Sequence, residues 1–247
     1  QIIAFVSRVL RCAVQGPGLS KVDSSQAIVC GRAYSDIRTS REMKLYDFPN
    51  APNPRRVKVV AAEKGIELDY VTVDMTKREH KSAEFMQKNP SGKIPVLELA
   101  DGTCISESIA ICRYLESMHP TPNLFGDGAL EIAQIEMAHR QIELELMSQI
   151  GTSWVNGPIV AKMGLIEPIE AAKQRSDSLT NAFYRRMDNE LGQRDYIAGE
   201  RYTMADITAA IAVDFASAMV ALKPDTALTN LWAWHQRVTT RPGYANA

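Results

Sequence analysis

The sequence predicts a small α/β domain followed by a larger all-α domain, on three observations. A β-α-β pattern spans Met43–Asp74, a linker rich in proline and glycine spans His119–Gly128, and only helical periodicity follows it. Two parallel strands joined by a helix are typical of α/β domains. The chain has 247 residues, which is long enough for two domains of ordinary size. We therefore expect domains at residues 43–120 and 128–247.

The α/β domain is expected to follow the order β-α-β-α-β-β-α, with a mixed sheet. Its first helix has clear boundary residues, because Asn53 suits the N-cap, Pro54 the first helical position and Gly65 the end. The turn "ADGT" is typical of a hairpin. The expected strands are Lys44–Phe48, Leu68–Val73, Val96–Leu99 and Thr103–Ile105, and the later helices are Ser82–Lys88 and Glu107–Met118.

The helical domain shows a period of 3.6 residues in four segments. Thr203 and Asp206 have the spacing of a capping box, and Tyr202 with Ile207 has that of a hydrophobic staple. We interpret this motif as structural, since it begins a helix that is apolar on nearly all sides. The expected helices are Ala129–Ile150, Pro168–Leu191, Thr203–Leu222 and Leu228–Thr240.

Residues 1–42 differ from the rest of the chain, because they show no sustained hydrophobic period and end just before Met43. The stretch "RVLRCAVQG" has some features of a targeting segment, but its apolar run is short, contains arginine and lacks a clean cleavage signature. We interpret residues 1–42 as a non-native or disordered extension upstream of a start at Met43. A transit peptide is the alternative interpretation.

Composition excludes several classes of function. The 28 basic and 29 acidic residues nearly cancel, which argues against a nucleic-acid surface built on bulk charge. No run of 18 apolar residues occurs, so we expect no membrane partner. The four cysteines are sparse and form no C-x-x-C pair, which favours a reduced, cytoplasmic context. Cys104 in a strand and Cys112 on an apolar helix face are expected to be structural.

Two stretches of the α/β domain have the features of a binding site. In "GKIPVLEL", a cis bond before Pro95 would aim the backbone of Ile94 into a cleft, where it can pair with an extended peptide. An ordinary trans proline at a strand start is the alternative. In "SESIAICRYL", Ser106 suits a helix cap that leaves Glu107 and Ser108 in the first turn. Free N–H groups there bind a carboxylate and Glu107 attracts an ammonium group, although a plain capped helix is the alternative.

These stretches, in this order, make the chain resemble a cytosolic glutathione transferase from Met43 to Ala247. The resemblance depends on the β-α-β start, "NPSGKIPVLEL", "SESIAICRYL" and "YIAGERYTMADI". It implies a thioredoxin-like domain followed by a helical domain, a homodimer, and glutathione bound between the domains as a co-substrate. It implies no metal and no further cofactor, and it favours the cis bond before Pro95.

The resemblance also assigns glutathione contacts. It implies that Ile94, next to Pro95, pairs its backbone with the cysteinyl part of glutathione. It places the γ-glutamyl end at Glu107 and Ser108 and the glycyl carboxylate at Lys93 and His80. Without the resemblance, His80 is expected to be a solvated residue at a helix start and Lys93 a surface charge.

The usual catalytic side chain is absent, because Ala51 stands where related transferases carry a serine that hydrogen-bonds the thiolate. Ala51 offers only its backbone N–H. Asn53 is the first candidate substitute, as its amide can donate to an anion. The N-terminus of the helix is the second, with charge added by Arg55 or Arg56, although two solvated arginines are the alternative there.

A water held by the helical domain is the third candidate, because the chain most resembles a fungal and bacterial subgroup that lacks the usual serine, tyrosine or cysteine. The water ligands of that subgroup align with Gly151 and Val155. Neither side chain can hold a water, so the neighbours Thr152 and Ser153, with Asn156, are the candidates. The alternative is that "GTSWVNGP" is only a helix end.

We therefore predict a glutathione transferase that conjugates the glutathione thiol to small hydrophobic electrophiles, held near Trp154 and Met163. The alternatives are a glutathione-dependent disulfide or peroxide reductase and a non-catalytic glutathione-binding protein. The absent hydroxyl at Ala51 keeps both alternatives open.

Overall fold

The computed structural model describes residues 43–164 and 166–247. The interpretation of residues 1–42 therefore lies outside the described residues. The α/β domain contains strands β1 (Lys44–Asp47), β2 (Asp69–Thr72), β3 (Val96–Glu98) and β4 (Cys104–Ser106), helices α3 (Pro52–Glu63), α4 (Ala83–Lys88) and α5 (Ser108–Met118), and a 3-10 turn at Glu79–Lys81.

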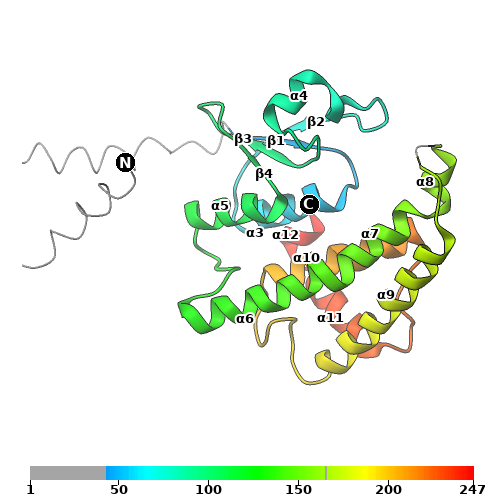
Figure 1. The fold of residues 1–247 in the computed structure, drawn as a ribbon. Coiled ribbons are helices and arrows are strands. Elements are labelled where there is room, and N and C mark those ends of the chain that lie inside the picture. The colour runs from blue at the N-terminus through cyan, green and yellow to red at the C-terminus, as the bar shows by residue number, and fades with distance from the viewer. Residues whose placement is uncertain (1–42, 165) are drawn as a thin grey trace, which may run out of the picture. The chain divides into compact units, whose positions relative to one another are not determined.

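The four strands form one mixed sheet in the order β2-β1-β3-β4. β1 is parallel to β2 and antiparallel to β3, and β3 is antiparallel to β4, so the predicted order and mixed sheet are confirmed. Side chains alternate between the two faces. Leu45 and Leu97 join the core that includes residues of α3 and α5, whereas Val96 packs with Phe85 of α4 on the other face. α4 therefore lies on one side of the sheet, and α3 and α5 lie on the other (Figure 1).

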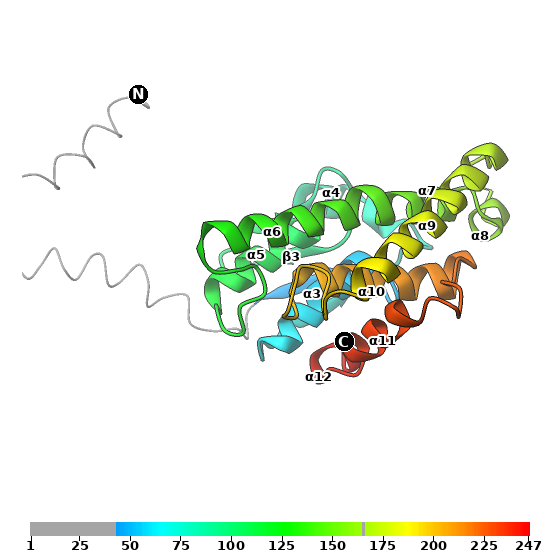
Figure 2. The ribbon, with the colours of Figure 1, turned by 90° about the horizontal axis from the view of Figure 1, so that it is seen from below.

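The helical domain follows the linker and is built around α10. Its helices are α6 (Gly128–Gln141), α7 (Ser148–Val155), α8 (Pro158–Lys162), α9 (Glu170–Leu191), α10 (Met204–Phe215), α11 (Thr229–Thr239) and α12 (Pro242–Ala245), with π-helical segments at Ile142–Met147 and Ala216–Val220. α10 packs against α3 of the first domain as well as α6 and α11 (Figure 2). It therefore joins the two domains through one apolar core.

The capping box before α10 is confirmed and becomes part of a larger buried network. Asp206 is fully buried, and its Oδ2 accepts from the N–H of Thr203 at 2.9 Å. Its Oδ1 accepts from the indole N–H of Trp234 and the N–H of Ile197, both at 2.9 Å. Burial raises the pKa of this carboxyl. One side chain thus fixes the start of α10 to α11 and to the loop before it.

Several predicted helix boundaries are wrong. The segment predicted to end at Ile150 continues through a π-helical turn to Val155. The short helices α8 and α12 were not predicted, because four or five residues carry no helical periodicity, although each begins with a proline. Within the part of the chain that the structure describes, no helix combines the length and the apolar character needed to cross a membrane.

Candidate functional site

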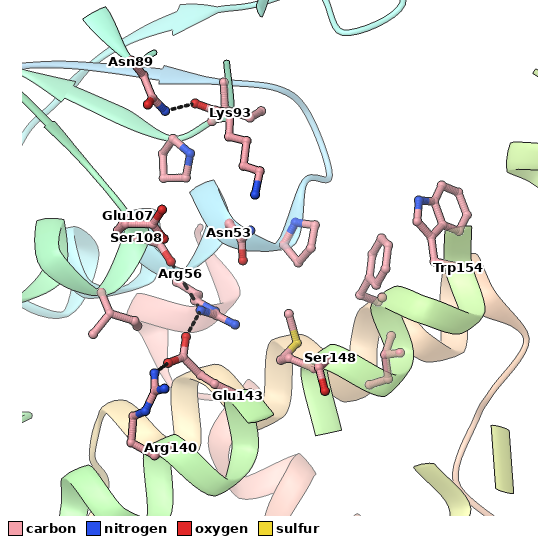
Figure 3. A pocket seen from close by; sticks show the side chains of 18 of the residues that line it. Asn53, Arg56, Asn89, Lys93, Glu107, Ser108, Arg140, Glu143, Ser148 and Trp154 are labelled. Atoms are coloured by element: carbon pink, nitrogen blue, oxygen red, sulfur yellow. Dashed lines mark hydrogen bonds and ion pairs between the residues drawn. The ribbon is translucent and has the colours of Figure 1, made fainter. Parts of the chain in front are cut away.

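A cavity of about 660 Å³ opens between the two domains. The starts of α3, β3 and α5 form one wall, and α6, α7 and the end of α10 form the other (Figure 3). Six of the predicted site residues line this cavity together, which are Asn53, Lys93, Ile94, Pro95, Glu107 and Ser108.

The turn before β3 presents its backbone to the cavity. The Ile94–Pro95 bond is cis, as the resemblance implied. Asn89 holds this turn, because its Nδ2 donates to the carbonyl of Lys93 at 2.7 Å while its Oδ1 accepts from Ser91. The side chain of Lys93 is exposed and extends into the cavity (Figure 3). It makes no hydrogen bond or ion pair with any described residue.

The start of α5 differs from the prediction that Ser106 caps this helix. Ser106 still belongs to β4, where it pairs with Val96, so the chain has a single residue left in which to turn. That residue is Glu107, which is the N-cap with φ 67° and ψ 114°. A positive φ costs a side-chain-bearing residue roughly 1–3 kcal/mol and is typical of functional positions. Ser108 is then the first residue of the helix. The exposed Glu107 carboxylate forms no hydrogen bond or ion pair with a described residue, although its charge acts on Arg56.

The start of α3 also differs from the prediction, because Asn53 is not its N-cap. The helix begins at Pro52, whose fixed φ suits the first position, and Ala51 is the N-cap without a side-chain hydrogen bond. Pro52 and Pro54 have no N–H, and the N–H of Ala51 donates to the carbonyl of Phe48 at 3.1 Å. Asn53 is therefore the only one of residues 51–54 that has free donors, and its side chain is exposed in the cavity.

A chain of charges forms the base of the cavity. Arg56 Nη1 donates to Glu143 Oε1 at 3.0 Å and to Ser108 Oγ at 3.3 Å. The other oxygen of Glu143 accepts from Arg140 at 3.0 Å (Figure 3). Burial lowers the pKa of Arg56, and the Glu143 carboxylate opposes that shift. Glu143 lies in the π-helical segment Ile142–Met147, and such segments are frequent at functional sites.

Four predicted site residues do not line this cavity. Ala51 lines a second cavity of about 650 Å³, together with Arg55 and Asp214. His80 lies in the 3-10 turn, its Nδ1 is buried without a partner, and burial lowers its pKa. Thr152 is exposed and donates to the carbonyl of Ser148 at 3.0 Å. Ser153 is fully buried and donates to Asp177 of α9.

Sequence reasoning missed the residues that the helical domain brings to the cavity. Arg140, Glu143 and Phe215 lie far from Asn53 in sequence, and only the fold brings them to the same cavity. Arg56 was considered only together with Arg55, but the two point to different places. Arg55 pairs with Asp214 of α10 at 2.8 Å, beside the second cavity. Cys112 is fully buried, and burial raises its pKa to about 12, in agreement with a structural role.

Comparison with known proteins decides the family. The model described as "Glutathione S-transferase, N-terminal domain" matches residues 41–117, and the one described as "Glutathione S-transferase, C-terminal domain" matches residues 146–242. The chain belongs to the glutathione S-transferase family. Its α/β domain is accordingly the thioredoxin-like domain of that family, followed by the helical domain.

Relatives of this glutathione S-transferase occur in fungi and bacteria. Glutathione S-transferase 2 of Saccharomyces cerevisiae is 36% identical over 214 residues, which are 83% of this chain and 89% of that protein. The crystal structure of Gtt2 from the same organism has a TM-score of 0.77 at 34% identity, covering 82% of this chain and 99% of that one. A glutathione S-transferase domain-containing protein from Marinobacter aquaeolei VT8 has a TM-score of 0.74 at 32% identity, covering 81% and 99%.

His139, a buried residue of α6, is expected to make stability depend on pH. Its side chain is buried, and burial lowers its pKa from 6.5 to about 4, with Glu143 opposing the shift. The unfolded chain therefore binds this proton more readily, so the stabilisation is complete above pH 6.5 and is lost as the pH falls towards 4. The difference corresponds to about 3 kcal/mol.

The measurement is the free energy of unfolding in urea between pH 7 and pH 4. His139→Gln should lose about 3 kcal/mol less than the parent protein over this interval. His119→Gln is the matched control, because His119 is exposed, and it should keep the parent slope. A parent-like slope in His139→Gln would contradict the prediction.

Proposed function

We propose that the first cavity binds glutathione and lowers the pKa of its thiol, so that the thiolate is transferred to a small hydrophobic electrophile. The observation that carries the proposal is the set of unpaired groups in the cavity. Glu107 and Lys93 are charged and their side chains form no hydrogen bond or ion pair with any described residue, and Asn53 has free donors. Glutathione carries an ammonium group, two carboxylates and a thiol, so each free group has a complement.

The γ-glutamyl end is proposed to bind at the start of α5. Glu107 complements the ammonium group, while the hydroxyl of Ser108 and the free N–H groups of the first turn complement the carboxylate. Ile94, directly before the cis proline, offers backbone groups to the cysteinyl part. Lys93 then complements the glycyl carboxylate. His80 does not line the cavity, so we propose for it only a weaker, more distant interaction with the glycyl carboxylate.

Asn53 is the proposed donor to the thiolate. It lines the cavity at the start of α3, and its amide donates to no described residue. Thr152 and Ser153 are less favoured, because their hydroxyls are bonded within the helical domain. Ala51 is also less favoured, since its N–H donates to Phe48. A thiolate at this position would also benefit from the helix dipole.

The electrophile is proposed to lie on the helical side of the cavity. Trp154 and Phe215 line it there in an edge-to-face pair with ring centroids 5.5 Å apart, next to Met147. Aromatic and apolar side chains of this kind hold small hydrophobic molecules. Met163 does not line the cavity, so only the Trp154 part of the predicted electrophile site supports this proposal.

Two assays on the purified protein test the function. Titration calorimetry with glutathione is expected to show binding, and incubation with glutathione and a small aryl halide is expected to yield the thioether. Reduction of a small disulfide or peroxide without thioether formation would select the reductase alternative. Binding without either reaction would select the non-catalytic alternative, and absence of binding would contradict all three functions.

We propose that the protein is located in the cytoplasm.

A homodimer is also proposed. Leu130, Met137 and Leu144 follow each other at seven-residue intervals along α6 and the π-helical segment, and they are 73%, 59% and 58% exposed. A row of exposed apolar side chains of this kind is typical of an interface. Sedimentation equilibrium is expected to give twice the chain mass for the parent protein and the chain mass for Met137→Glu. A monomeric parent protein at micromolar concentration would contradict the proposal.

A further inference from the structure

The second cavity has the size and the lining of a site for an apolar ligand. Its volume is about 650 Å³, which lies within the usual range for small-molecule sites. It is formed by the loop before α3, the first turns of α3, the end of α10 and the π-helical segment that follows. Most of its lining residues are apolar, among them Phe48, Pro49, Ile211, Ala218 and Met219.

The charged residues that line this cavity are paired within the protein. Arg55 pairs with Asp214 at 2.8 Å, and both line the cavity. Asp214 also accepts a hydrogen bond from the hydroxyl of Tyr244 at 2.7 Å. Lys58 pairs with Asp47. A neutral apolar ligand leaves all of these pairs in place, whereas a charged ligand would have to compete with them.

The second cavity borders the first at the place where the reaction is proposed to occur. Pro52 and Phe215 line both cavities. Pro52 directly precedes Asn53, the proposed donor to the thiolate. Phe215 forms the edge-to-face pair with Trp154, beside which the electrophile is proposed to lie. The sulfur and the reacting end of the electrophile therefore both lie next to this border.

The first cavity has to hold glutathione and the electrophile together. Its volume is about 660 Å³, and sites of about 300–1,000 Å³ hold a single drug-sized ligand. Glutathione is a tripeptide and takes up much of this volume. The remaining room beside Trp154 suits the reacting end of an electrophile, and the second cavity offers the nearest further apolar space for a longer molecule.

We propose that the substrate is an electrophile with an extended apolar tail. Its reacting carbon lies between Asn53 and Trp154, and its tail passes Pro52 and Phe215 into the second cavity. This inference rests on the proposed function and narrows the class of electrophile. Apolar burial alone holds the tail, so each methylene that enters the second cavity strengthens binding.

Product analogues that carry a tail on the sulfur test this inference by titration calorimetry. S-methyl-, S-hexyl- and S-decylglutathione should bind the parent protein with affinities that rise up to about fourfold for each methylene that becomes buried. Ala218 is exposed and lines the second cavity, so Ala218→Phe fills that cavity from its rim. This variant should keep the affinity for S-methylglutathione within about twofold and bind S-decylglutathione at least about tenfold more weakly than the parent protein. Ala218→Ser is the matched control and should bind all three analogues like the parent protein.

Gly151→Leu fills the first cavity instead. Gly151 lines that cavity one helical turn before Trp154, and a Cβ at this position would meet no atom within 4 Å. The gain in affinity from the methyl to the decyl analogue should fall more in Ala218→Phe than in Gly151→Leu. The opposite order would place the tail beside Trp154 and would overturn the inference. Equal affinities of the three analogues for the parent protein would overturn it as well.

A photolabel on the parent protein decides the question if Ala218→Phe does not fold. S-decylglutathione with a diazirine at the end of its tail should label Met219 and residues 48–51, which line the second cavity. Labelling of Met147, which lines the first cavity, in place of these residues would overturn the inference while the proposed function stands. If neither glutathione nor S-methylglutathione binds the parent protein, the proposed function itself is overturned.

Discussion

Asp206→Ala is expected to lower the free energy of unfolding by about 3–5 kcal/mol, the largest effect of any single substitution considered for this chain. Asp206 is fully buried, and its two oxygens accept from Thr203, Ile197 and Trp234. Removing the carboxylate leaves these buried donors without acceptors, and each such donor costs about 1–3 kcal/mol. The lost hydrogen bonds all lie at the start of α10, the helix that packs against both domains.

Urea unfolding of three variants distinguishes this network from a general effect of lost charge. Asp206→Asn keeps one acceptor oxygen but turns an amide towards a donor, so its loss should be smaller than that of Asp206→Ala. Asp195→Ala is the surface control, because its side chain is 68% exposed, and it should stay within about 0.5 kcal/mol of the parent protein. A loss below about 1 kcal/mol in Asp206→Ala would show that the network does not determine the stability of α10.

Asn53→Ala is expected to raise the thiol pKa of bound glutathione by about one to two units. A hydrogen bond to a charged acceptor contributes about 1.5–3 kcal/mol, and one pKa unit corresponds to 1.36 kcal/mol. Stability should change by less than about 0.5 kcal/mol, because Asn53 does not cap α3. The measurement is the thiolate absorbance of bound glutathione between pH 5 and pH 9.

Thr152→Ala is the matched control for Asn53→Ala. Its hydroxyl donates to the carbonyl of Ser148 within the same helix, so its removal should leave the thiol pKa unchanged. The opposite pattern, in which Thr152→Ala raises the pKa and Asn53→Ala does not, would assign the thiolate to a water held by the helical domain.

The sequence predicted the strands, the long helices and the turn before β3, because these features depend on local pattern. Alternating apolar residues identify β2, and the stretch "GKIPVLEL" identifies a strand that starts after Pro95. The cis bond before Pro95 was favoured only by the family resemblance. The two wrong helix caps have local causes as well. Pro52 rather than Pro54 occupies the first position of α3, and the pairing of β4 continues through Ser106.

The part of the site that could not be predicted depends on tertiary contacts. Arg56 and Arg55 are adjacent in sequence, but the helix turns one towards Glu143 and the other towards Asp214. Thr152 and Ser153 were chosen as sequence neighbours of Gly151 and Val155, but both hydroxyls are bonded within the helical domain. The pair between Arg56 and Glu143 forms only when α3 packs against the helical domain, so it cannot be predicted from local sequence.

The central claim is that this cavity lowers the thiol pKa of glutathione without a serine, tyrosine or cysteine at the end of β1. The most direct measurement is an ultraviolet titration of glutathione bound to the parent protein, which follows the thiolate from pH 5 to pH 9. The account predicts a thiol pKa about one to two units below that of free glutathione, near neutrality. A pKa equal to that of free glutathione would contradict it and would favour a protein that binds glutathione without activating it.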